Sequence, residues 1–593
     1  MSQPRYVVGI DLGTTNSVVA WIDAIAASDP DTLDVQILDV PQLVKPGVTE
    51  ARRRLPSFLY FPASGEMDPA SRALPWGPAT HVTGELARTR GAEVPSRVVA
   101  SAKSWLCAVG VERDAQILPW GAPDDVPHVS PVEAAAAYLG HLRAAWDASM
   151  PAPIAEQEVY LAVPASFDAA ARDLTMRAAE AAGLRGAHLV EEPQAAFYAY
   201  LAATRGAWRE QVRTGEVILV CDVGGGTTDL SLVAVGEESG ALVLERKAVG
   251  DHILLGGDNM DLTLAHALRV RLAEKGTSLD EWQLRGLVHA CRDAKEKLLT
   301  GDGKAKEPVV VLGRSKKVIG GTLRTDVERR DVEATLVDGF FPVVGPDDTP
   351  RTMRRVGLQE IGLPYASDPA ITRHVAAFLA RHRDVTPTGV SAVLFNGGVM
   401  HAARFRERMV EVLSSWRGEG GVRVLAAAHP DLAVAEGAAV YGLARRGRGV
   451  RIRGGTARAY YVGVETAAPA VPGMVAQVKA LCLAPFGMEE GTEVELPGAE
   501  FGLVVGEPAE FRLFGSSVRR DDQPGAVVEG WQHGTLEELP PLEATLDAVG
   551  DAGRTVPVKL RAHVTELGTL ELWCVARDGA QRWKLEFNVR QAH

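Results

Sequence analysis

Residues 7–15 read VVGIDLGTT, and residues 219–229 read LVCDVGGGTTD. Each stretch is a short apolar run that ends in an aspartate and continues into a glycine turn and a pair of threonines. A second apolar run follows each of them, at 17–22 and at 230–235, so both stretches predict a β-hairpin of the same kind. Two such hairpins in one chain indicate two related lobes.

The segments between the two hairpins have helical periodicity, as in 168–182 and 193–203. Asp168 stands at the start of the first of these segments and is a suitable N-cap. Strands that alternate with helices predict an α/β architecture. We therefore expect residues 1–445 to form one α/β domain of two lobes.

The pattern changes after about residue 443. Residues 444–455 read ARRGRGVRIRGG, which is typical of a connector, and we place the linker at 446–455. Beyond it, apolar and polar residues alternate, as in 583–590, with turn signals at 567–568 and 578–579. This period predicts an all-β domain over residues 456–593.

Composition limits the classes of protein to which the chain can belong. With 593 residues, of which 46% are hydrophobic and 23% charged, it can bury several cores and is not mainly disordered. The 63 basic and 76 acidic residues give a net charge of −13. Because such a surface repels a phosphate backbone, we expect no nucleic acid partner.

The cysteines and the apolar runs indicate the compartment. The five cysteines are an odd number, are widely spaced and form no C-x-x-C pair, which favours a reducing compartment without structural zinc. Asp11 interrupts the first apolar run before it could act as a signal peptide. No run approaches the roughly 18 residues needed to cross a bilayer. We expect a soluble cytoplasmic protein without a membrane partner.

The two hairpins offer the groups that a nucleotide triphosphate requires. Glycines let backbone N–H groups approach phosphate oxygens, threonine hydroxyls donate hydrogen bonds, and Mg²⁺ takes one or two carboxylates together with water. Asp11 and Asp222 would supply those carboxylates. A single turn of this kind could simply connect two strands without a binding role, but two copies in related lobes favour the binding of one nucleotide from both sides. Gly397 and Gly398, after the apolar run 390–395, would let backbone lie against a nucleoside.

Six segments also carry a resemblance to a known family: IDLGTTNS at 10–17, VPASF at 163–167, EP at 192–193, DVGGGTTD at 222–229, LGG at 255–257 and AEGAA at 435–439. In this order they are similar to the 70-kilodalton heat-shock chaperones, of the actin-like ATPase superfamily. The resemblance covers roughly residues 5–445 and, more weakly, the β domain. It implies an actin-like (ribonuclease H-like) ATPase domain followed by a peptide-binding β-sandwich, in a divergent bacterial-type member.

The resemblance implies ATP or ADP and Mg²⁺ as cofactors and assigns roles to residues. Asp11 and Asp222 would hold the metal, mainly through water, and Lys103 would orient the attacking water and stabilise charge on the γ-phosphate. The catalytic set is Lys103, Glu192, Asp222, Thr227 and Asp229. The nucleotide-binding set is Gly13, Thr14, Thr15, Asn16, Gly224, Gly225, Gly226, Gly257, Lys295, Gly397 and Gly398.

Pro164 and Arg172 match a pair through which the family relays nucleotide state to its second domain. From the residues alone, Pro164 could simply end a strand and Arg172 could be an exposed residue on the surface of a helix. We expect Glu191, beside Glu192, to be a surface residue.

The chain departs from the family at the adenine pocket. Glu296 stands where a base-stacking cation is common, and Arg292 stands where an acid is usual. The glycine pair is followed by Val399, Met400 and His401, without an arginine at the family's offset, although His401 could stack on a purine. The resemblance therefore leaves the base preference open.

Three further departures concern coupling to the second domain. The connector offers only Val450 and Ile452 among arginines, so docking by strand addition would depend on backbone. His188 stands where an arginine commonly meets a J-domain, which leaves a J-domain co-chaperone and a nucleotide exchange factor open as partners. The sequence stops at His593, where the family continues into a helical lid, so we expect a lidless member. We assign no role to the Pro- and Gly-rich stretch 340–368.

The expected function is a slow, chaperone-like ATPase that couples its Mg·ATP state to the binding of unfolded or extended polypeptide. An ATPase whose β domain binds one dedicated client protein is nearly as well supported. A small-molecule kinase of the same superfamily is less favoured, because we find no acceptor-binding loop with its own base. A filament of the actin kind is a further, structural alternative.

Overall fold

The computed structural model divides into two compact units, residues 1–242 with 249–451 and residues 243–248 with 452–593. The predicted boundaries, 1–445, 446–455 and 456–593, stay predictions. The structure describes residues 4–27, 32–108, 111–238, 241–251, 253–300, 304–311, 323–351, 363, 365–417, 420–425, 429–454, 456, 458–466, 478–488, 491–497, 500–516, 518–519, 521–529, 535–547, 554–565 and 569–588. No helix among these residues combines the length and the apolar character that a membrane span requires.

The first lobe is built on a sheet that contains the predicted hairpin. β1 (Tyr6–Leu12) and β2 (Asn16–Asp23) pair antiparallel, and β12 (Glu158–Val163) and β13 (His188–Glu191) add parallel in the order β13-β12-β1-β2-β3. β3 (Gln36–Ile37) closes that order, and β6 (Leu55–Pro56) also pairs with β2. The hairpin at 7–22 is thus confirmed.

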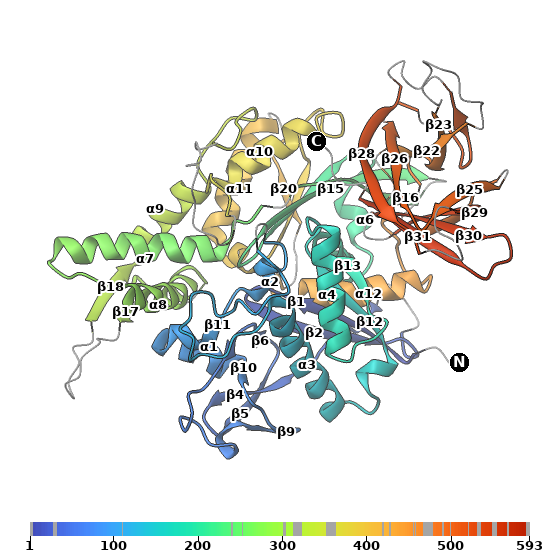
Figure 1. Cartoon of the computed structure of the whole chain (residues 1–593). Coiled ribbons are helices and arrows are strands. Elements are labelled where there is room, and N and C mark those ends of the chain that lie inside the picture. The colour runs from blue at the N-terminus through green and yellow to red at the C-terminus, as the bar shows by residue number, and fades with distance from the viewer. Residues whose placement is uncertain are drawn as a thin grey trace. The chain divides into compact units, whose positions relative to one another are not determined.

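The second lobe repeats this arrangement around the second hairpin, which is confirmed as well. Its sheet runs β20-β19-β14-β15, with β14 (Val217–Val223) antiparallel to β15 (Thr228–Glu238) and parallel to β19 (Ala392–Asn396), which pairs parallel with β20 (Arg423–Leu425). Asp222 lies opposite both Asp229 and Asn396 in this register. The same sequence of parallel and antiparallel pairs in both sheets supports the two related lobes (Figure 1).

Helices α5 (Glu192–Ala203) and α12 (Ala433–Arg445) pack closely against each other beneath the two sheets. Their contact depends on Gly437, where a Cβ atom would lie 1.6 Å from the carbonyl oxygen of Ala195. Gly9 of β1 is equally close to α12, since its Cβ would lie 2.1 Å from the carbonyl oxygen of Ala435. Glycines thus permit the close approach of backbone at the centre of this unit.

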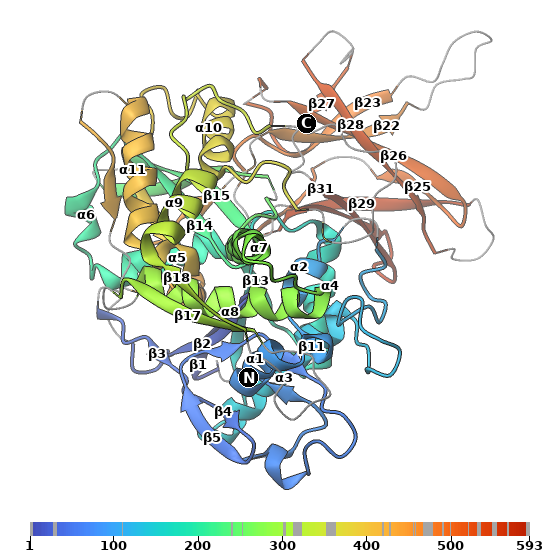
Figure 2. The ribbon, with the colours of Figure 1, turned by 90° about the vertical axis from the view of Figure 1, so that its left-hand side faces the viewer.

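The remaining helices of the first unit pack partly on these sheets and partly on one another and on the smaller strands (Figure 2). Asp168 caps α4, as predicted, because its side chain accepts a hydrogen bond from the Ala171 backbone N–H. The helices are α1 (Glu85–Glu93), α2 (Ala102–Trp105), α3 (Pro131–Ser149), α4 (Ala169–Ala181), α6 (Trp208–Gln211), α7 (Gly257–Glu274), α8 (Glu281–Thr300), α9 (Arg329–Phe340), α10 (Ile371–Arg381) and α11 (Ala403–Arg417). The smaller strands are β4 (Val40–Lys45), β5 (Val48–Arg52), β7 (Leu59–Tyr60), β8 (Ala73–Leu74), β9 (Gly77–Pro78), β10 (Val82–Thr83), β11 (Val98–Val99), β17 (Lys306–Val311) and β18 (Leu323–Glu328). Within the stretch 340–368, residues 352–362 and 364 lie outside the described residues.

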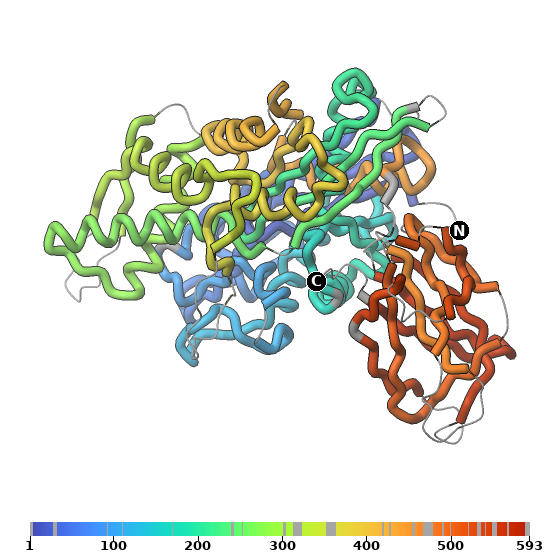
Figure 3. The backbone as a smooth tube through the Cα atoms, turned by 90° about the horizontal axis from the view of Figure 1, so that it is seen from above, coloured from blue at the N-terminus to red at the C-terminus, as the bar shows by residue number. Residues whose placement is uncertain are grey.

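The second unit consists of two β-sheets that share one apolar core (Figure 3). One sheet runs β27-β23-β22-β26-β28, and the other runs β24-β29-β30-β31 with β25 paired to β29. The strands are β22 (Ala459–Glu465), β23 (Val478–Ala484), β24 (Thr492–Glu495), β25 (Phe501–Val505), β26 (Pro508–Ser516), β27 (Val527–Val528), β28 (Glu537–Thr545), β29 (Arg554–Val564), β30 (Thr569–Ala576) and β31 (Arg582–Asn588). Core residues such as Val462 and Leu585 come from different sheets.

The predicted alternation is present in β31, where Trp583, Leu585 and Phe587 are buried. The predicted turn at 578–579 contains Gly579 with a φ of 70°, whereas the turn at 567–568 and residues 589–593 lie outside the described residues. The connector supplies β21 (Arg453–Gly454), which pairs parallel with Glu245 and Arg246 of β16 (Ala241–Val249). Docking of the connector by strand addition as a means of coupling the domains stays a prediction.

Candidate functional site

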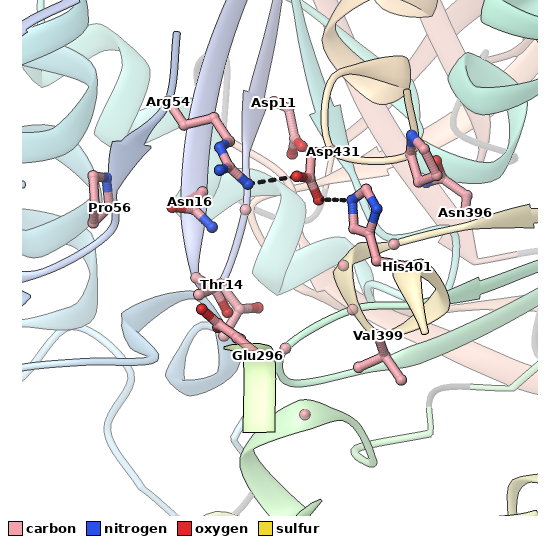
Figure 4. Close-up of a pocket in the computed structure, with 18 of the residues that line it drawn as sticks. Asp11, Thr14, Asn16, Arg54, Pro56, Glu296, Asn396, Val399, His401 and Asp431 are labelled. Atoms are coloured by element: carbon pink, nitrogen blue, oxygen red, sulfur yellow. Dashed lines mark hydrogen bonds and ion pairs between the residues drawn. The ribbon is translucent and has the colours of Figure 1, made fainter. Parts of the chain in front are cut away.

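A cavity of about 720 Å³ lies in the first unit where the two hairpin turns meet. Its walls come from both lobes and from the segment that leads into α12 (Figure 4). Fifteen of the predicted site residues line it: Asp11, Gly13, Thr14, Thr15, Asn16, Lys103, Glu192, Asp222, Gly224, Gly225, Thr227, Gly257, Lys295, Gly397 and Gly398. Gly226 and Asp229 lie in the same hairpin as Asp222, whereas Pro164 and Arg172 are not among the lining residues.

The two hairpin turns face each other at very short range. A Cβ atom on Gly225 would lie 2.1 Å from Oγ1 of Thr15, and one on Gly226 would lie 2.5 Å from Oγ of Ser104. Gly397, at the end of β19, has a φ of 86° and lies against the carbonyl oxygen of Val223. These positions therefore need glycine, both for space and, at Gly397, for backbone conformation.

Two buried polar atoms at this place have no hydrogen-bond partner among the described residues. They are Oγ of Ser104, which lies beside Gly226, and Oδ1 of Asn396, at the end of β19. Buried polar groups are normally satisfied, so an exception calls for an absent ligand or water. Asn396 lines the cavity, where its Oδ1 can accept a hydrogen bond from a bound water or a nucleoside hydroxyl, and the residues fit the nucleotide that the sequence predicts.

Lys103 and Glu192 form a buried ion pair in the cavity wall. Lys103 is carried by the short helix α2, and Glu192 is the first residue of α5. Burial alone would lower the pKa of Lys103, but Glu192, Asp11 and Asp229 together raise it above the usual value. Lys103 is therefore a fixed positive charge beside the predicted phosphate site.

Three carboxylates surround this charge. Burial raises the pKa of Asp11 to about 6 and that of Asp222 to about 7, although Lys103 opposes the first shift and a hydrogen bond from Asn396 opposes the second. Asn396 Nδ2 donates to Asp222 Oδ2 at 2.5 Å, and Ser166 Oγ donates to Asp229 Oδ1 at 2.7 Å. The raised pKa values mean that the residues around these buried carboxylates supply too little positive charge to compensate them. Mg²⁺ with its waters would supply the missing charge.

We expect the affinity of the cleft for Mg²⁺·ADP to increase as the pH rises from 5.5 to 7.5. Asp11 and Asp222 are partly protonated over this range, and each proton must leave before the carboxylate can hold the metal. One such proton corresponds to up to about tenfold in affinity per pH unit. Calorimetric titration at several pH values measures the change, with metal-free ADP as the control. An affinity independent of pH would show that neither carboxylate meets the metal.

The cavity wall around Gly257 and Lys295 contains a network of charges in which sequence analysis missed the two acidic members, Asp258 and Asp261. Lys295 Nζ pairs with Asp261 Oδ1 at 2.6 Å and donates to the Gly257 carbonyl at 3.1 Å. Arg292, the residue that stands where an acid is usual, pairs with Asp261 at 2.7 Å and with Asp258 at 2.6 Å. Asp258 follows the predicted Gly257 directly and Asp261 lies one helical turn further on, so the glycine motif was the available signal.

His401 contacts protein through the edge of its ring, which leaves the ring faces open, so stacking on a purine stays a prediction. Its Nε2 pairs with Asp431 Oδ1 at 2.6 Å, and Arg54 pairs with the other oxygen of Asp431, as Figure 4 shows. Glu296 lines the same cavity, and its carboxylate lies 3.8 Å from Arg88. Arg54 and Asp431 had no distinguishing pattern in the sequence, because their pairing joins positions 377 residues apart.

The predicted relay residues lie together behind the cleft. Arg172 NH2 donates to the Ala165 carbonyl, next to Pro164, at 3.0 Å and to Glu191 Oε1 at 3.3 Å. Glu191 is 1% exposed, so our expectation of a surface residue was wrong. The reason is that residues 189–191 of β13, the end strand of the sheet, are buried, and Arg172 of α4 compensates the buried charge.

The start of the connector is held by the first lobe. Arg446 pairs with Glu158 at 2.6 Å and donates to the Pro4 carbonyl at 3.1 Å. Arg448 donates to the carbonyl oxygens of Ala24 and Ala27, at 2.5 and 3.1 Å. The arginines that distinguish this connector therefore bind backbone and a carboxylate around β1, β2 and β12.

Comparison with known proteins adds independent information. Residues 7–324 match the family model described as Hsp70 protein. The chain is 30% identical over 331 residues to a chaperone protein HscA homolog of Acinetobacter baumannii, covering 53% of this chain and 45% of that protein. It is 31% identical over 294 residues to the chaperone protein DnaK of Thermotoga petrophila, covering 49% of this chain and 40% of that protein. The match thus spans less than half the length of these relatives.

Proposed function

The chain belongs to the Hsp70 protein family, and from that premise we propose that it hydrolyses ATP slowly and couples its nucleotide state to the binding of extended polypeptide. Family membership gives the first unit the actin-like ATPase fold. The observation that carries the proposal is the meeting of the two glycine turns, Gly225 against Thr15, around Lys103 and the buried carboxylates. The matched relatives are named as chaperone proteins.

In this proposal the glycine turns and threonines bind the phosphates. Backbone N–H groups at Gly13, Gly225 and Gly226 approach the oxygens, and the hydroxyls of Thr14, Thr15 and Thr227 donate to them. Asn16 and Gly224 complete the turns, while Gly257, Lys295, Gly397 and Gly398 line the nucleoside side. Bound Mg²⁺ would neutralise phosphate charge, and Asp11 and Asp222 would hold it mainly through water.

Hydrolysis then depends on position and charge rather than on a covalent intermediate. Lys103 stabilises charge that develops on the γ-phosphate, and its pairing with Glu192 keeps the ammonium in place. Asp229, fixed by Ser166, accepts a hydrogen bond from the attacking water. With no phosphoryl acceptor required, we expect a rate well below the roughly 1 to 100 per second of kinases.

Coupling to the second unit would use the relay around Pro164 and Arg172 and the connector. Arg172 bridges Glu191, the neighbour of Glu192, to the backbone that follows Pro164. A movement of the Glu192 backbone would therefore be passed to the segment after Pro164 through the buried ion pair of Glu191 with Arg172. We propose a J-domain co-chaperone and a nucleotide exchange factor as further partners. We place the protein in the cytoplasm.

We expect extended peptides to change the single-turnover rate of ATP hydrolysis by several-fold. The measurement compares phosphate release with and without a panel of unfolded apolar peptides. The same measurement on Arg172→Gln, which removes the positive charge paired with the buried Glu191, should show reduced stimulation. If no peptide alters the rate of the native chain, coupling of this kind is untenable.

A β domain dedicated to one client is a second candidate, favoured by the charged connector that binds the first lobe through Arg446 and Arg448. Under this alternative, generic peptides leave the rate unchanged while one partner protein from the native source changes it. A small-molecule kinase would instead show hydrolysis strongly stimulated by a sugar or carboxylic acid.

A further inference from the structure

Ser101 joins the two lobes next to Lys103. It lies in the first lobe, directly before α2, and its hydroxyl donates to Asp258 Oδ2 at 2.5 Å. Asp258 lies in the first turn of α7, in the second lobe. Because a hydrogen bond to an ionised acceptor is stronger than a neutral one, this contact holds α2 to α7 across the cleft.

Asp258 is in turn held by Arg292, which reaches back to the first lobe. Arg292 NH2 donates to Asp258 Oδ1 at 2.6 Å, and Arg292 Nε donates to Asp261 Oδ2 at 2.7 Å. The guanidinium carbon lies 5.7 Å from the ring centre of Phe58, a first-lobe residue, which is within the range of a cation–π contact. The side chains of Asp258 and Arg292 are only 13% and 10% exposed. Ser101, Asp258 and Arg292 therefore form an interlobe clasp.

The backbone at Ser101 is under strain, which indicates that the contacts of the clasp impose its conformation. Ser101 has a φ of 54° and a ψ of 30°, a left-handed conformation that residues other than glycine rarely adopt. Such a conformation persists where surrounding contacts impose it. Helix α2 comprises only four residues, 102–105, so it has little rigidity of its own. The direction in which Lys103 leaves the backbone therefore depends on how Ser101 is held.

We propose that the Ser101–Asp258–Arg292 clasp is a positioning device that sets Lys103 against the phosphates when the two lobes are closed. Ser101 and Asp258 are positioning residues, because they act through Lys103. The inference rests on the proposed function, since that function gives Lys103 its task. According to this inference, closure of the two lobes also places the Lys103 ammonium against the phosphates. Lys295, which shares Asp261 with Arg292, connects the clasp to the nucleoside side of the cavity.

The test measures single-turnover ATP hydrolysis and Mg²⁺·ADP affinity in Ser101→Ala, Asp258→Ala and the double variant. Loss of one charge-assisted hydrogen bond is expected to lower the hydrolysis rate by about tenfold. The affinity for Mg²⁺·ADP should change by less than about threefold in Ser101→Ala, because Ser101 is not among the residues that line the cavity, whereas Asp258 is. The double variant should be no slower than the slower single variant, since both remove the same contact. Ser71→Ala, on a loop of the first lobe, is the matched control.

Hydrogen exchange gives a readout that does not depend on hydrolysis. With Mg²⁺·ADP bound, Ser101→Ala should raise exchange across residues 102–106 by about tenfold, by the same energetic argument, and leave α3 unchanged. Folded variants whose hydrogen exchange and hydrolysis rate are unchanged would overturn the clasp. Two other results would do the same: rate losses of the single variants that multiply in the double variant, or an ADP affinity that falls together with the hydrolysis rate. If the native chain releases no phosphate, the proposed function fails, whereas the exchange result still decides whether Asp258 holds α2.

Discussion

Replacing Lys103 with alanine is expected to reduce single-turnover ATP hydrolysis by roughly 100- to 1,000-fold, the loss found when a preorganised group that stabilises transition-state charge is removed. The ammonium is buried, paired with Glu192 and close to Asp11 and Asp229. Its removal therefore takes away the fixed positive charge next to the phosphate turns.

Binding must be measured in the same variant, because Glu192 is left buried without its partner. We expect Mg²⁺·ADP still to bind and to raise the melting temperature, since the glycine turns and Asp222 are intact. Lys297→Ala is the matched control: this lysine lies on α8, its side chain is 58% exposed, and it pairs with Glu307. Normal turnover in Lys103→Ala would refute the role assigned to Lys103.

Replacing Gly437 with alanine is expected to destabilise the first unit by about 1 to 3 kcal/mol, the usual cost of forcing atoms into a packed core. The added methyl group would lie 1.6 Å from the Ala195 carbonyl oxygen, so α5 and α12 must move apart. Because α5 begins at Glu192, nucleotide binding should weaken as well.

Gly140→Ala is the control for the Gly437 variant. Gly140 lies within α3, and its Cβ atom would meet nothing within 4 Å, so the same change should stabilise by about 0.5 to 1 kcal/mol. Thermal and denaturant unfolding measure both effects. If Gly437→Ala is as stable as the native chain, the close crossing of α5 and α12 is not required.

The sequence predicted the parts of the fold that depend on local pattern. The Asp11 and Asp222 stretches show the pattern of strand, glycine turn and strand, and both form antiparallel hairpins. The cap at Asp168 and the alternation around Trp583 are equally local. The glycine pair at 397–398 was informative because it ends an apolar run.

The rest of the site depends on contacts between distant segments. Arg54 and Asp431 meet only because α12 returns to the first lobe, and Ser101 meets Asp258 only when the lobes face each other. Glu191 was misplaced for the same reason, since nothing in its neighbours shows that Arg172 would compensate it inside the sheet. Charged residues with distant partners carry no periodic signal that a single sequence can reveal.

One measurement tests the central claim most directly: single-turnover phosphate release from ATP by the native chain, with Mg²⁺ and without any added acceptor. We expect one phosphate per chain, released slowly, with release abolished by a chelator of Mg²⁺ and slowed roughly 100- to 1,000-fold by Lys103→Ala. Phosphate release that needs a small-molecule acceptor, or that proceeds equally well without Mg²⁺, would contradict it.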